Sequence, residues 1–65
     1  MRSYSSREII KVLESRGWFL VCITGSHYQF KHPFMKGRVT VKHPDKDVPM
    51  ATLKSIERQS GIKFE

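Results

Sequence analysis

The fold is decided by residues 18–31, which read WFLVCITGSHYQFK. The first part, residues 18–24, is rich in aromatic and β-branched side chains, a composition typical of a strand. A Gly-Ser pair then gives a short turn signal, and residues 27–31 alternate between apolar and polar side chains. The stretch therefore predicts two antiparallel strands joined by a tight turn.

The first of these strands is apolar on both of its faces: Phe19, Val21 and Ile23 on one, Trp18, Leu20 and Cys22 on the other. A strand with one face in water normally carries polar residues at every second position. Two interpretations follow. Either helix ends and loops cover the second face, so that the strand is core and Cys22 is a small buried hydrophobe, which we favour, or an apolar strip is left open for a protein partner.

Downstream, a loop is predicted over residues 32–37 and a third strand over residues 38–42, where valines alternate with polar side chains. Residues 44–49 contain two prolines and two aspartates, which break the strand. A second helix is predicted over residues 50–59, with Gly61 as its left-handed stop.

Upstream, Ser5 and Glu8 have the spacing of a capping box, and apolar residues follow at helical intervals. Gly17 ends this segment, so the first helix is predicted over residues 6–16.

The order is α-β-β-β-α within a single domain over residues 1–65, an α+β fold with a three-stranded antiparallel sheet and two helices on one face. The inward strand residues are Tyr28, Phe30, Val39 and Val41, which we expect to meet Ile9, Leu13, Leu53 and Ile56 of the helices. The outer face then carries mostly polar and basic side chains: His27, Gln29, Lys31, Arg38, Thr40 and Lys42.

The chain is basic, with 12 Lys and Arg against 6 Asp and Glu. A net charge of +6 favours a polyanionic partner, whether nucleic acid, an anionic membrane or an acidic protein. The longest apolar run, residues 18–23, is far shorter than the ~20 residues of a membrane-spanning helix, and the N-terminus lacks the apolar stretch of a signal peptide. A lone cysteine fits the reducing cytoplasm, where we expect the protein to act. The Cys and His spacing matches no zinc site, and the sequence predicts no metal or small-molecule cofactor.

A histidine on a basic sheet face suits RNA chemistry. RNA carries its own nucleophile, the 2′-hydroxyl, so a nuclease needs proton transfer and stabilisation of the phosphate charge. Histidine, with an ordinary pKa of ~6.5, suits the first task, and Lys and Arg suit the second. The hypothesis is therefore that His27 is a general acid or base, and that its neighbours hold the phosphate: Ser26, Lys31, Arg38 and Lys42. The sequence does not identify the second proton-transfer group, and the candidates are His32, His43, a lysine and water.

The sequence resembles the HicA (YcfA-like) mRNA interferase toxins from residue 5 to about residue 62. The resemblance rests on Gly17-Trp18, Gly25-Ser26-His27, Val39-Thr40-Val41 and Leu53-Lys54-Ser55-Ile56 with Gly61. It implies a fold like a double-stranded-RNA-binding domain, metal-independent cleavage of mRNA, and neutralisation by a HicB antitoxin that covers the active site and is usually encoded alongside. It also implies that His27 is the catalytic histidine. Many relatives have a proline and a basic residue before a histidine after the third strand; here the run is Val41-Lys42-His43-Pro44, so no role is carried over to His43.

The main alternative is a module that binds double-stranded RNA or a protein and does no chemistry. Double-stranded-RNA-binding domains grip phosphates with a lysine-rich start to their last helix. Here residues 48–53 contain no basic residue, and Lys54 is the first. The absence of that basic cluster argues against the alternative.

Overall fold

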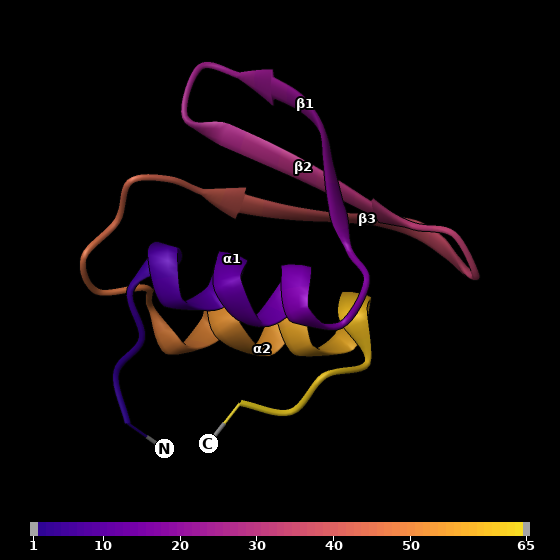
Figure 1. Ribbon diagram of the computed structural model, residues 1–65. Helices are drawn as coiled ribbons and strands as arrows, with labels where there is room; N and C mark the ends of the chain where they lie inside the picture. The colour runs from indigo at the N-terminus through magenta and orange to yellow at the C-terminus, as the bar shows by residue number, and fades with distance from the viewer. Residues whose placement is uncertain (1, 65) are drawn as a thin grey trace.

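The computed structural model describes residues 2–64 and has five elements, in the order α1 (Ser6–Ser15), β1 (Phe19–Thr24), β2 (His27–His32), β3 (Met35–Lys42) and α2 (Met50–Ser60). The strands form one antiparallel sheet in the order β1-β2-β3. Both helices lie on the same side of this sheet (Figure 1). The predicted α-β-β-β-α order and open three-stranded sheet are confirmed.

The second hairpin is tighter than the sequence predicted. Instead of a loop over residues 32–37, β2 runs to His32 and β3 begins at Met35, with these two residues paired across the turn. Pro33 suits the second position of such a turn because its ring fixes φ. The His32 ring also holds the turn, since its Nδ1 accepts a hydrogen bond from the Phe34 backbone N–H at 3.1 Å. The predicted six-residue loop is therefore wrong.

The core forms between the helices and the inner face of the sheet. At its centre, residues from the sheet and from both helices are at most 1% exposed: Phe30, Val39, Val41, Ile9, Leu13, Leu53 and Ile56. Tyr28 is half-buried against this cluster, and Trp18 is buried just before β1. The predicted core is confirmed in all but the partial exposure of Tyr28.

Strand β1 lies outside this core. The helices pack mainly against β3, and β1 is the strand farthest from them (Figure 1). Every residue of β1 is exposed, including Phe19 (49%), Leu20 (41%), Val21 (42%) and Ile23 (51%). The interpretation of β1 as a covered core strand is therefore wrong, and so is a buried Cys22, which is exposed.

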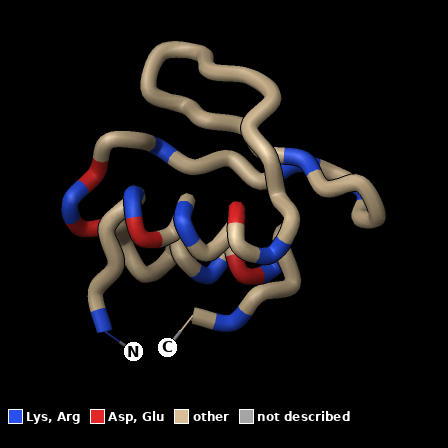
Figure 2. Tube along the Cα trace, in the orientation of Figure 1, with Lys and Arg blue, Asp and Glu red and all other residues tan. Residues whose placement is uncertain are grey.

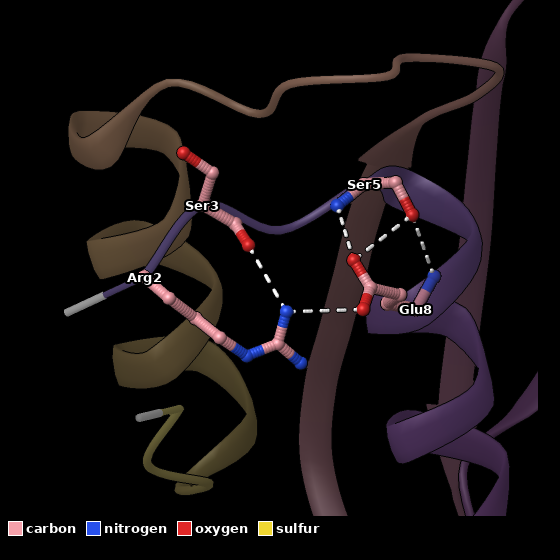
Figure 3. Close-up of polar contacts among 4 residues, drawn as sticks. All are labelled: Arg2, Ser3, Ser5 and Glu8. Carbon is pink, nitrogen blue, oxygen red and sulfur yellow. Dashed lines mark hydrogen bonds and ion pairs between the residues drawn. The ribbon is translucent and has the colours of Figure 1, made fainter.

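A capping box begins α1, as predicted. The Ser5 hydroxyl accepts the Glu8 backbone N–H at 3.2 Å, and the Glu8 carboxylate accepts the Ser5 backbone N–H at 2.9 Å. Arg2 adds an ion pair to the same carboxylate at 3.1 Å (Figure 3). These bonds satisfy donors that would otherwise be unpaired at the start of the helix.

The capping box predicts a pH dependence. The hydrogen bond from the Ser5 backbone and the bond from Arg2 hold the pKa of Glu8 below its ordinary value. Because the folded-state pKa is the lower one, this stabilisation is present at neutral pH and is lost as the pH falls through the carboxyl range. We expect Glu8→Gln to lower the melting temperature slightly at pH 7, with the difference from the wild type vanishing in acid.

Melting curves between pH 7 and pH 2 measure this effect, and Glu14→Gln in the same helix is the control. A difference between Glu8→Gln and the wild type that stayed constant over this pH range would contradict the prediction.

Candidate functional site

His27 is exposed at the start of β2, directly after the Gly25-Ser26 turn. In the sheet register it lies between Thr24 of β1 and Lys42 of β3. Gly25 has φ of +60°, a left-handed conformation that glycine adopts without steric cost. The turn therefore places the histidine on the middle strand, flanked by a residue on each side.

His43, the residue directly after β3, anchors this turn. Its backbone N–H donates to the Ser26 carbonyl at 2.8 Å. Its ring forms a hydrogen bond through Nδ1 to the Ser6 hydroxyl at 2.7 Å and meets the Tyr28 ring edge-on, with centroids 4.8 Å apart. The ring therefore faces the helical layer, whereas the neighbouring Lys42 belongs to the outer face. His43 links the start of α1 to the turn that carries His27.

Ser6 holds this link together. Its side chain is buried, and its hydroxyl also accepts the Asp45 backbone N–H at 2.8 Å. We expect Ser6→Ala to lower the free energy of unfolding by about 1–3 kcal/mol, because two polar groups lose their partner in a buried place.

Urea denaturation measures this loss. Ser15→Ala is the matched control, since it removes a single hydrogen bond, to the Val12 carbonyl, at an exposed position. If the free energy of unfolding fell equally in the two variants, the buried hydrogen bonds of Ser6 would stabilise the fold no more than the exposed hydrogen bond of Ser15.

The predicted phosphate contacts are spread along the sheet. Lys42 is directly opposite His27 on the neighbouring strand. The Cβ atoms of two residues paired in this way are usually about 4.5–5.5 Å apart. Lys31 is four residues further along β2, or about 13 Å at the usual rise of a strand. Arg38 is equally far from Lys42 on β3, and its Nη1 donates to Gln29 Oε1 at 2.8 Å. Only Ser26 and Lys42 are therefore close to His27.

The charged side chains of the sheet are all basic. Residues 15–44 contain no Asp or Glu and five basic residues: Arg16, Lys31, Lys36, Arg38 and Lys42. The described acidic residues belong to the helices and to the loop before α2 (Figure 2). The sheet therefore attracts anions along its whole length.

His32 has a structural role that the sequence did not reveal. It is at the far end of β2 from His27, and its Nε2 is 3.0 Å from the Arg16 carbonyl. Because Nδ1 accepts the Phe34 N–H, Nε2 carries the proton of the neutral ring and donates to that carbonyl. Gly17 makes room for the ring, since a Cβ there would be 2.8 Å from Nε2. His32 thus joins the end of α1 to the second hairpin.

Residues 2–64 contain no cluster of metal ligands, but they do form a surface hollow. No three His, Cys, Asp or Glu side chains come together there in a way that could hold a metal ion. A hollow of about 440 Å³ opens where α1 begins, lined by Ser5, Ser6, Arg7, His43, Pro44, Asp45 and Lys46. None of the predicted RNA-contacting residues lines it.

Comparison with known families accounts for almost the whole chain. A family model for the HicA toxin of bacterial toxin–antitoxin systems matches residues 6–62, from the first residue of α1 to the segment after α2. The chain belongs to the HicA toxin family. The match spans the complete α-β-β-β-α fold of this HicA chain, with Gly25-Ser26-His27 inside it.

Membership in the HicA family makes this chain the toxin of a toxin–antitoxin system and implies an antitoxin partner. No curated protein matches the sequence. Neither helix within residues 2–64 is long and apolar enough to cross a membrane.

Proposed function

We propose that this toxin is an endoribonuclease that cleaves mRNA in the cytoplasm, with His27 as its catalytic residue. The observation that carries the proposal is the position of His27, exposed on the middle strand of an acid-free sheet and directly opposite Lys42. An exposed imidazole beside a fixed positive charge combines a proton-transfer group with a phosphate ligand.

The proposed reaction uses the 2′-hydroxyl of RNA as the nucleophile. His27 takes the proton from this hydroxyl or gives one to the departing 5′-oxygen. Lys42 offsets the charge that develops on the phosphate, and Ser26 donates to the same group. Lys31 and Arg38 lie about 13 Å further along the sheet in the same direction, toward the β2–β3 turn, and bind phosphates on one side of the cleaved bond. A second group, a lysine or water, makes the other proton transfer, and the proposed reaction includes no metal ion.

Cleavage of a synthetic mRNA fragment in the presence of EDTA tests this chemistry. We expect cleavage to persist, to leave a 5′-hydroxyl on the downstream product, and to stop when the nucleotide before the cut carries a 2′-deoxyribose. Loss of activity in EDTA, or cleavage of the deoxy substrate, would contradict the mechanism.

Within this proposal, the antitoxin is a HicB-like protein that covers His27. An acidic antitoxin would be steered to the basic sheet by long-range attraction. The alternative is a non-catalytic RNA- or protein-binding module. Growth arrest on induction in a bacterial host, relieved by co-expression of the neighbouring gene, supports the toxic nuclease, whereas undisturbed growth supports the module.

We expect Lys42→Gln to weaken RNA binding and to reduce the salt dependence of binding. Each lost phosphate contact on a single strand lowers the slope of log affinity against log salt by about 0.7. Because Lys42 also neighbours His27, the variant should cut more slowly even with saturating RNA. Lys31→Gln should change the slope equally but leave the saturated rate nearly unchanged.

Lys54→Gln, on α2 beside Glu57, is the control that removes a charge from outside the sheet. A salt slope that fell as much in Lys54→Gln as in Lys42→Gln would mean that the sheet does not hold the RNA.

A further inference from the structure

Strand β1 is an edge strand that carries neither a charge nor a proline, and its register with β2 shifts between Leu20 and Cys22. It pairs with β2 on one side, and on its other side no described strand lies against it. Exposed edges normally carry charges or proline, which discourage the pairing of a further strand. The sequence of β1, FLVCIT, contains neither, and four of its side chains are large, apolar and 41–51% exposed.

The backbone of β1 adds to this surface. In an antiparallel pair, every second residue directs its N–H and C=O away from the neighbouring strand, and in β1 this alternation is interrupted where the register shifts between Leu20 and Cys22. At the free edge of β1 these groups are available to a further strand. The edge thus offers both hydrogen-bonding groups and apolar side chains, the two features used when a protein binds an extended segment by strand addition.

We propose that the free edge of β1 binds an extended segment of the antitoxin, which adds a fourth strand to the sheet. This surface is distinct from the outer face that carries His27. The inference rests on the antitoxin partner implied by the HicA family and does not depend on the proposed nuclease activity.

Charge identifies the kind of segment that fits. All three strands lie within residues 15–44, a stretch of 30 residues that contains no acidic residue. A bound strand with apolar side chains facing β1 and acidic residues beside it would match both the apolar strip and the surrounding positive charge. RNA does not fit this edge, because β1 itself has no charged side chain to hold a phosphate.

A second copy of the chain fits less well. Two copies would bring together sheets that each carry the same excess of positive charge.

A double variant tests the apolar side chains of the edge. Val21→Thr with Ile23→Thr keeps β-branched residues in the strand but makes two exposed positions polar. Binding to the purified antitoxin encoded by the neighbouring gene is measured by calorimetry, and we expect the affinity to fall about tenfold or more. Phe34→Thr is the matched control, because Phe34 is 91% exposed in the β2–β3 turn, away from β1. The control should bind within about twofold of the wild type.

Hydrogen exchange on the wild-type chain tests the backbone and is independent of any effect of substitution on folding. The amides of residues 19–24 that point away from β2 should exchange rapidly in the free chain and become protected in the complex. Equally fast exchange in both states would overturn the proposal, whatever the variants do. Protection that appears in the chain alone and grows with its concentration would also overturn it, since a second copy would then be the occupant. A chain that binds the antitoxin in this way but cuts no RNA would refute the nuclease and leave this inference standing.

Discussion

Replacing His27 with alanine is expected to slow RNA cleavage by at least about a hundredfold, the usual minimum contribution of a general acid or base. The fold should survive, because His27 is exposed and its side chain has no part in the core. Cleavage rates at saturating RNA measure the effect, and the circular dichroism spectrum checks the fold.

Thr24→Ala, directly opposite His27 on β1, is the matched control and should keep most of the activity. Two further readouts separate catalysis from binding. The pH dependence of the wild-type rate should lose one limb in His27→Ala, and added imidazole should restore part of the rate. If the alanine variant cut RNA as fast as the wild type, His27 would not be the catalytic residue.

Replacing Phe30 with alanine is expected to unfold the isolated chain. Phe30 is 1% exposed at the centre of the sheet, where it pairs with Val39. Truncation of a buried phenylalanine costs about 3–5 kcal/mol, and a domain of this size has only about 3–5 kcal/mol of net stability. Thermal melting and the dispersion of amide resonances measure the loss.

Phe34→Ala removes the same side chain from an exposed turn and should change stability by no more than about 0.5 kcal/mol. A partner that binds only the folded state should restore structure to Phe30→Ala by mass action. A cooperative, wild-type-like melting curve for Phe30→Ala without any partner would show that the core does not depend on this ring.

Local patterns were sufficient to predict the elements and the core. Ser5 with Glu8 and the left-handed Gly61 mark two helix ends, and the alternation of Tyr28 and Phe30 identifies the inner face of the sheet. Each of these signals acts within a few residues, so it can be read without knowing the rest of the structure.

Features that depend on lateral position could not be predicted. Alternation along β1 predicted that Phe19 and Ile23 share a face, but the register shift between Leu20 and Cys22 places Phe19 opposite Lys31 and Ile23 opposite Tyr28. Alternation also does not show whether a helix lies beneath a face, and the helices pack mainly against β3. The same limit applies to the site, because alternation puts Lys42 on the face of His27 without showing that the register places the two directly opposite each other. The roles of His32 and His43 were equally hidden, since both depend on contacts with α1 or its end.

During synthesis, His27 leaves the ribosome before the residue that fixes its turn. The Ser26 carbonyl accepts a hydrogen bond from the backbone N–H of His43. The ribosome adds His43 16 residues after His27. The His43 ring is in turn held by the hydroxyl of Ser6, near the N-terminus. A nascent chain that has exposed only the first hairpin therefore lacks the ordered turn. The proposed site is therefore complete only when most of the sequence has been translated, so the proposed nuclease activity would begin only after that point.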